Sequence, residues 1–209
     1  MQLTSAFERS TGEAIRRRNE AGVAWKIALS LSMAGVIGLL AQWRIPLPFS
    51  PIPLTGQTFG VLLAGVLLGK KWGGISAGLY AILGFAGVPW FNGATSGVGV
   101  TAGYLLGFVL AALFIGFKTD GRKLNYAQTF GWMLFAVTVL IYIPGLIWLG
   151  LWLNLVKNAP TGIFAVLTMG AIPFLAGDVL KAALAALASK VVSHPSNSDF
   201  RVDGKRYSR

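Results

Sequence analysis

The stretch Pro173-Phe-Leu-Ala-Gly-Asp178-Val-Leu-Lys181 places two charges inside an otherwise apolar region. Asp178 and Lys181 are the only charged residues between Lys157 and Lys190. A charge at membrane depth costs about 3 to 17 kcal/mol, so such residues tend to mark a site or a pathway. Residues three apart in a helix share a face and interact. The pair therefore predicts the floor of a binding pocket, with a purely structural ion pair as the alternative.

The composition around this pair indicates an integral membrane protein in a lipid bilayer. The 209 residues are 55% hydrophobic and 12% charged, which is about half the charged fraction of a soluble domain. The 27 glycines suit helices that pack closely in lipid. The chain has no cysteine and one histidine, which excludes disulfides, thiolate nucleophiles and cysteine or histidine metal clusters. No metal and no cofactor is expected.

The apolar runs predict an all-α protein with six transmembrane helices between polar ends. Residues 1–22 form a predicted basic cytoplasmic arm, 23–192 a membrane domain and 193–209 a polar basic cytoplasmic tail. The predicted spans cover about 23–43, 58–69, 73–88, 101–117, 126–153 and 174–192, and a short helix or surface segment is expected over 161–172. Pro144-Gly145 is expected to kink or stop the fifth span.

The basic residues orient these spans. Fifteen of the 18 Lys and Arg fall in the arm and its junction, at 70–71, at 118–123 and after Ser189, whereas the opposite loops hold only Arg44 and Lys157. Cytoplasmic loops carry the excess of Lys and Arg, so both termini are predicted to be cytoplasmic. The net charge of +11 is therefore explained by the orientation of the chain in the membrane, and no nucleic acid partner is expected. The protein is placed in the inner or plasma membrane of a bacterial cell.

Two irregular segments open on the same outer side as Asp178. The segment Arg44–Gln57 contains prolines at 46, 48, 51 and 53, which forbid a helix and favour extended backbone. Extended backbone cannot face lipid unpaired, so it must lie on protein or line a cavity. It is a candidate lid, with a plain connector as the alternative. The Gly87–Gly99 segment is rich in glycine and predicts a second loop.

The pocket chemistry suits a small amphiphilic acid that carries N–H groups. A carboxylate accepts from N–H donors, an ammonium holds a carboxylate, and aromatic side chains supply apolar walls. The candidate ligand-binding residues are Asp178, Lys181, Asn92, Gln57, Thr55, Trp90, Tyr104 and Phe49. Taken singly, Asn92 and Gln57 are more often turn or capping residues.

The sequence gives no sign of catalysis. There is no Ser-His pairing, no second membrane carboxylate and no GxxxxGK[ST] phosphate loop. An enzyme is therefore not predicted, and active transport would need ATPase subunits supplied by other chains. The main alternative is a stand-alone proton-coupled carrier for a small organic acid that uses Asp178 as its relay. An intramembrane enzyme is a third reading, which the absence of a nucleophile and base disfavours.

Four blocks of sequence together resemble the BioY family. They are Pro51-Ile-Pro-Leu-Thr-Gly-Gln-Thr58, Gly84-Phe-Ala-Gly-Val-Pro-Trp-Phe91, Gly103-Tyr-Leu-Leu-Gly-Phe108 and Pro173 to Lys181. The resemblance implies a biotin-specific S component of an energy-coupling factor transporter, working with a transmembrane coupling subunit and two ATPase subunits. It implies that Asp178 and Lys181 bind biotin; which end of the ligand meets which residue stays open. The segment Phe91–Gly97 is poorer in glycine than the family pattern, which puts Asn92 in doubt as a contact.

Small residues recur at helical spacing along the first predicted span. They are Ala24 and Ala28, followed by Ser30 and Ala34. Such residues let helices approach closely, so they either pack inside the bundle or form a groove for another subunit. In S components a face of this kind docks on the coupling subunit, and the resemblance implies that role for these four residues.

Overall fold

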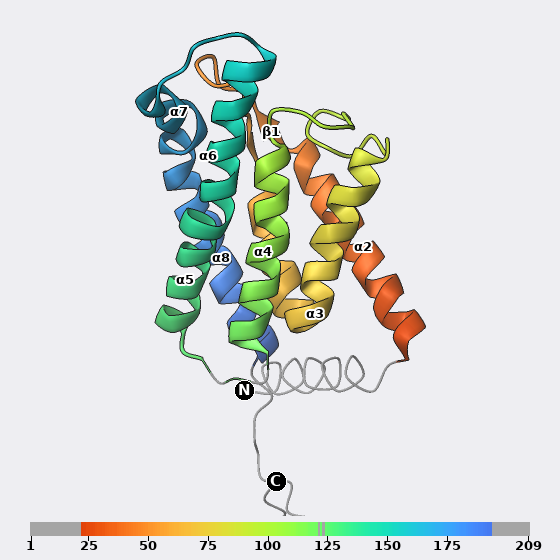
Figure 1. Ribbon diagram of the computed structural model, residues 1–209. Coiled ribbons are helices and arrows are strands. Elements are labelled where there is room, and N and C mark those ends of the chain that lie inside the picture. Colours follow the sequence, from red (N-terminus) through yellow and green to blue (C-terminus); the bar gives the residue numbers. More distant parts are fainter. Residues whose placement is uncertain (1–21, 121, 123, 194–209) are drawn as a thin grey trace, which may run out of the picture.

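The computed structural model describes residues 22–120, 122 and 124–193, and the predicted arm and tail lie almost wholly outside this part of the chain. The described part is helical apart from one two-stranded ribbon (Figure 1). Its elements are α2 Val23–Gln42, β1 Arg44–Ile45, β2 Leu54–Thr55, α3 Gln57–Phe85, α4 Ala102–Thr119, α5 Tyr126–Phe135, π-helix η1 Ala136–Ile141, α6 Tyr142–Leu151, π-helix η2 Trp152–Val156, α7 Ile163–Gly170, 3₁₀-helix η3 Ile172–Phe174 and α8 Leu175–Ser193.

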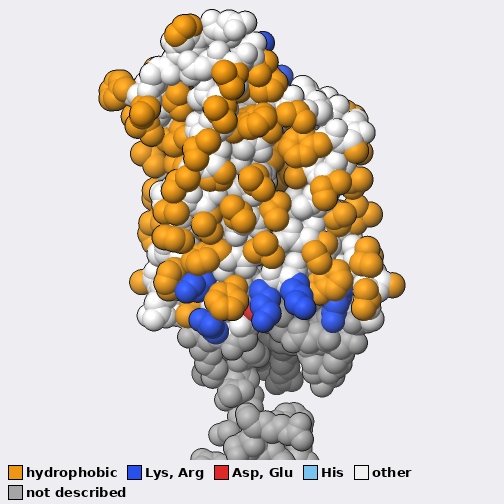
Figure 2. Space-filling view, in the orientation of Figure 1, with side chains coloured by type: hydrophobic (Ala, Val, Ile, Leu, Met, Phe, Trp, Pro, Cys, Tyr) orange, Lys and Arg blue, Asp and Glu red, His pale blue; other side chains and the backbone are white. Residues whose placement is uncertain are grey.

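The surface is that of a membrane protein. Four helical stretches of the described chain are long and apolar enough to cross a bilayer: Val23–Gln42, Ala102–Thr119, Tyr126–Val156 and Ile163–Lys190. Figure 2 shows apolar side chains over most of the visible face and a row of Lys and Arg across one end. Large side chains such as Leu39, Leu106 and Leu180 are more than half exposed, which is costly in water and favourable in lipid.

Helix α3 is two shorter helices folded back on each other at Gly69. The φ of Gly69 is +78° and its ψ is −175°, a conformation open essentially to glycine alone. A Cβ on Gly73 would lie 2.7 Å from the carbonyl oxygen of Ala64. In a straight helix, residues nine apart are separated by about 13 Å. The break before Lys70, predicted from the charge pair, is therefore confirmed.

Helix α4 is packed at backbone distance on both sides. Towards one end, a Cβ on Gly116 would lie 2.6 Å from the carbonyl oxygen of Gly69. Farther along, a Cβ on Gly107 would lie 2.6 Å from the Cα of Ile141. Close approach through small residues is typical of helices in membranes, and it holds α3 and η1 against α4.

Of the two predictions for Pro144-Gly145, a kink or a stop, the stop is wrong. Helix runs on from Tyr126 through Pro144 to Val156, slightly beyond the predicted end of the span at about 153. The irregularity lies in the preceding turns, where Ala136–Ile141 is π-helical. Neighbouring helices and local π adjustments re-satisfy backbone groups that a proline frees in a membrane helix, which explains why the element continues.

The ribbon and the long loops lie at the end of the molecule opposite to the row of basic residues (Figures 1 and 2). In the proline segment, β1 pairs antiparallel with β2, so that Arg44 faces Thr55 and Ile45 faces Leu54. The segment from Gly87 to Gly99 is a loop, as predicted, with a single bridge between Phe91 and Thr95. These irregular segments, together with the start of α8, surround the candidate site.

Candidate ligand-binding site

A pocket lies between the proline segment, the 86–101 loop and helices α3, α4, α6 and α8. Its cavity volume, counted as space for the centres of water-sized molecules, is about 50 Å³, within about 520 Å³ of empty space that includes open solvent. Its walls are Ile52, Pro53, Thr55, Gln57, Thr58, Asn92, Thr101, Tyr104, Leu105, Phe108, Ile141, Tyr142, Gly170, Phe174, Asp178 and Lys181. Six of the eight predicted ligand-binding residues are in this set. Stretches more than 120 residues apart in the sequence thus meet at one cavity.

Asp178 and Lys181 form the predicted pair. The Nζ of Lys181 donates to Asp178 Oδ1 at 2.7 Å, and their side chains are 15% and 6% exposed for Lys181 and Asp178. Pro173 lies in the 3₁₀ turn that leads into α8, where its fixed φ is compatible with a helix start. Asp178 is therefore in the first turn of α8, near the positive end of the helix dipole, which favours a carboxylate there.

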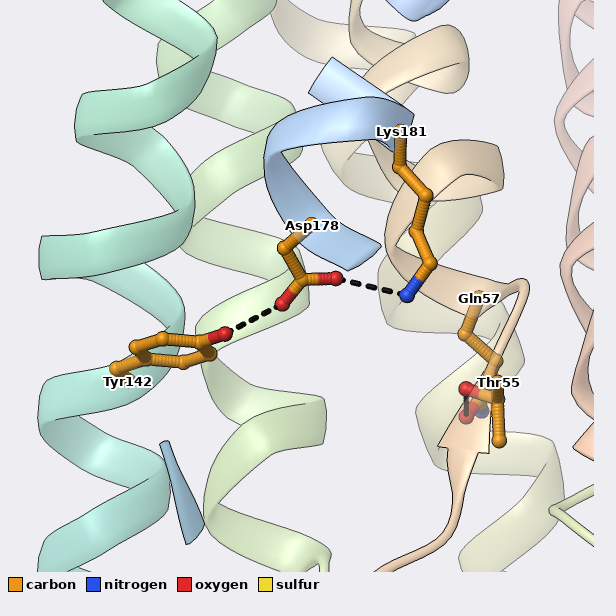
Figure 3. Close-up of polar contacts among 5 residues, drawn as sticks. All are labelled: Thr55, Gln57, Tyr142, Asp178 and Lys181. Carbon is orange, nitrogen blue, oxygen red and sulfur yellow. Dashed lines mark hydrogen bonds and ion pairs between the residues drawn. The ribbon is translucent and has the colours of Figure 1, made fainter. Parts of the chain in front are cut away.

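Tyr142 joins Asp178 and Lys181 in one hydrogen-bonded group, the Asp178 cluster, and was not predicted. Its hydroxyl donates to Asp178 Oδ2 at 2.5 Å (Figure 3), and the residue is 6% exposed. Both carboxylate oxygens of Asp178 therefore have a donor. The sequence held one signal: a tyrosine inside an apolar span needs a hydrogen-bond partner for its hydroxyl.

The π-helical segment η1 directs Tyr142 into the pocket. A π turn holds one residue more than an α turn, so it rotates the face of every residue that follows it. Ile141, the last residue of η1, and Tyr142, the first residue of α6, both line the pocket. π-Bulges are frequent at functional sites, and here the irregular turn supplies one of the three groups of the Asp178 cluster.

Thr55 and Gln57 form a second polar group in the wall. The Oγ1 of Thr55 donates to Gln57 Oε1 at 2.8 Å, and Gln57 Nε2 donates to the hydroxyl of Tyr80 at 2.5 Å. Gln57 is 7% exposed, so these bonds hold its amide in one orientation. The Figure 3 close-up draws Thr55 and Gln57 with the Asp178 cluster.

Tyr104 and Asn92 also line the pocket as predicted. The Tyr104 hydroxyl donates to the carbonyl oxygen of Gly170 at 2.9 Å, which ties α4 to the end of α7. Asn92 is half-buried in the loop. Neither placement tests contact with a ligand, and such contact stays a prediction for all eight residues.

Trp90 and Phe49 do not lie in the pocket wall. The indole of Trp90 donates to the carbonyl oxygen of Tyr80 at 2.9 Å, and its ring packs 5.4 Å from that of Tyr80. Its indole N–H is thus used inside the fold, and contact between Trp90 and a ligand stays a prediction. Phe49 is 59% exposed at the turn of the proline segment. Sequence position alone did not distinguish the two faces of these segments.

Two of the four predicted docking residues are inside the fold. Ser30 and Ala34 are fully buried, and the Ser30 hydroxyl donates to the carbonyl oxygen of Trp72 at 3.3 Å. Their side chains serve packing of α2 on α3, which corrects the docking assignment for this pair. Ala24 and Ala28 are exposed, and a docking role for them stays a prediction.

The geometry defines what the Asp178 cluster is able to bind. Lys181 Nζ and Asp178 Oδ1 place a donor and an acceptor side by side, and their formal charges cancel. Such a pair complements a group that also has adjacent N–H and C=O functions. In the described part of the chain, no three Asp, Glu, His or Cys side chains lie close enough to hold a metal ion.

The chain is also similar to known proteins. The BioY family model matches residues 13–197. A probable biotin transporter BioY of Methanothermobacter thermautotrophicus is 43% identical over 137 residues, covering 63% of this chain and 87% of the relative. The biotin transporter BioY of Rhizobium etli is 32% identical over 177 residues, covering 79% of this chain and 89% of the relative.

A solved structure supports the same comparison. The crystal structure of the S component for biotin from an ECF-type ABC transporter superposes with a TM-score of 0.69 at 26% sequence identity. The match covers 80% of this chain and 89% of the solved one.

Proposed function

The chain belongs to the BioY family, and on that premise we propose that it is the biotin-binding membrane subunit of an ECF-type vitamin importer. It captures biotin on the outer side of the cell membrane and delivers it inward. A transmembrane coupling subunit and two ATPase subunits supply the energy, so the chain itself is not an enzyme. The observation that carries the proposal is the Asp178–Lys181 pair, set in a largely apolar pocket.

The urea and the fused rings of biotin have counterparts in the pocket wall. The cyclic urea has adjacent N–H and C=O groups, which the acceptor Asp178 and the donor Lys181 complement. The fused rings are apolar, and Leu105, Phe108 and Phe174 provide apolar surface. A site that holds a urea through buried polar groups rejects analogues that lack it, because those groups would lose their partners.

The proposed topology has six crossings. The two halves of α3 that fold at Gly69 act as two short spans, and α2, α4, the 126–156 helix and α7–α8 supply the others. The row of Lys and Arg marks the cytoplasmic end, so the pocket opens outward. Ile52 and Pro53 line the pocket, which supports a lid role for the proline segment.

Biotin titration tests the proposal directly. The purified chain in lipid nanodiscs should bind biotin tightly in isothermal calorimetry. Lys181→Ala removes a charged hydrogen-bond donor and should weaken binding by about 2 kcal/mol or more. Lys190→Ala is the matched control, because Lys190 lies at the other end of the same helix, with its ammonium 5.7 Å from the Tyr126 ring. Its affinity should equal that of the wild type.

Absence of biotin binding by the intact chain would overturn the proposal. Uptake assays separate it from the stand-alone carrier. Liposomes that contain this chain alone should accumulate no biotin, and uptake should appear only with the coupling and ATPase subunits and ATP. Accumulation driven by a proton gradient, and lost on Asp178→Asn, would favour the carrier instead.

A further inference from the structure

The charges in the pocket wall leave one part of an acidic ligand without a counterpart. Asp178 and Lys181 are the charged residues that line the pocket, and they are paired at 2.7 Å. A carboxylate brought to Lys181 would also meet the negative charge of Asp178. The pair therefore suits a neutral group with a donor and an acceptor better than it suits an anion.

Arg44 pairs with a residue that lines the same pocket. It is in β1, directly across from the pocket residue Thr55 in β2. Cross-strand partners project to the same face of a ribbon, so the Arg44 side chain leaves the ribbon on the side of Thr55. Arg44 is exposed, and its guanidinium has no hydrogen bond or ion pair to any residue in the described part of the chain.

The guanidinium lies over Gly93, the neighbour of the pocket residue Asn92. A Cβ on Gly93 would lie 2.7 Å from Arg44 Cζ and 3.3 Å from Nε. Gly93 also has a φ of +71°, which side chains rarely adopt. Glycine at this position thus leaves space for a cation beside the loop residue that enters the pocket.

We propose that Arg44 binds the carboxylate of the ligand at the pocket mouth, while Asp178 and Lys181 hold the opposite, urea end. This inference rests on the proposed function, because it assumes a ligand with those two ends. A guanidinium matches a carboxylate through two parallel N–H donors. Arg44 then sets both the orientation of the ligand and the preference for the free acid.

The test compares an acid with its neutral analogue. Biotin and biotin methyl ester are titrated into the full chain in nanodiscs, for the wild type, Arg44→Gln and Lys157→Gln. Arg44→Gln should weaken biotin about 10-fold or more, as for loss of a charge-assisted pair, and should change the affinity of the ester less than about 2-fold. Lys157 is the other cation predicted for the outer loops and is also exposed, so its substitution should change neither affinity.

Arg44→Lys provides a second check, because it keeps the charge and loses the two-point geometry. It should bind biotin with an affinity between those of the wild type and Arg44→Gln. Equal losses for biotin and the ester, or no loss for either, would overturn the inference while leaving biotin binding intact. A wild-type chain that fails to bind biotin would overturn the proposed function, and this inference with it.

Discussion

Removing one member of the Asp178–Lys181 pair should cost more than removing both. Lys181→Met leaves a carboxylate that is 4% exposed with Tyr142 as its only remaining donor. Breaking a buried pair in this way costs 3 to 5 kcal/mol, and the 15% exposure of the Lys181 side chain together with the bond to Tyr142 favours the lower end, about 3 kcal/mol. Asp178→Asn, which strands the ammonium, should cost about the same.

The double variant Asp178→Asn/Lys181→Met carries no buried charge at this site. It should lose about 1 kcal/mol or less, because replacing both members of a buried pair is often nearly neutral. The sum of the two single costs would then exceed the double by at least about 5 kcal/mol, which is a large coupling for residues in contact.

The free energy of unfolding is measured without ligand, by SDS titration in mixed micelles, with fluorescence from the seven tryptophans as the signal. Lys190→Met serves as the matched lysine control and should change stability by less than about 0.5 kcal/mol. Single costs that add in the double variant to within about 0.5 kcal/mol would refute the reasoning, because independent sites behave in that way.

Three further outcomes are expected. Tyr142→Phe removes a bond to a charged acceptor and should weaken biotin binding by about 1.5 to 3 kcal/mol in calorimetry; unchanged affinity would show that the bond does not orient Asp178. Gly69→Ala forces a side chain into a glycine conformation and should destabilise the chain by about 1 to 3 kcal/mol in the same SDS assay, whereas Gly78→Ala, where a Cβ meets nothing within 4 Å, should be stabilising or neutral. Ala24→Leu/Ala28→Leu should keep biotin affinity and abolish uptake in cells that express the whole importer; normal uptake would exclude this face as the docking surface.

The sequence predicted the features that depend on local rules. Apolar runs and charge placement gave a helical membrane protein, since exposed apolar surface is tolerated only in lipid. Helical spacing of three residues was enough to pair Asp178 with Lys181. The break before Lys70 followed from two adjacent charges after an apolar run, and the structure places the turn at Gly69.

The errors concern which side of an element a residue faces. Small residues recur on both faces of α2, so spacing did not distinguish the exposed Ala24 from the buried Ala34. Tyr142 was missed because its direction depends on a π turn, and that turn is stabilised by contacts with other helices. Trp90 was assigned to the pocket because an aromatic residue in a loop suits a binding wall, although its indole donor is used inside the core.

The cancelling charges of Asp178 and Lys181 have an electrical consequence. An unpaired charge that moves through the whole membrane field contributes about 2.3 kcal/mol per 100 mV. Since the pair is neutral as a unit, any displacement of α8 along the membrane normal does no electrical work on this site. The voltage dependence of uptake should therefore reflect the charge of the ligand and of Arg44. In the absence of ligand, a diffusion potential of either sign, set with valinomycin, should leave the position of the Asp178–Lys181 pair unchanged.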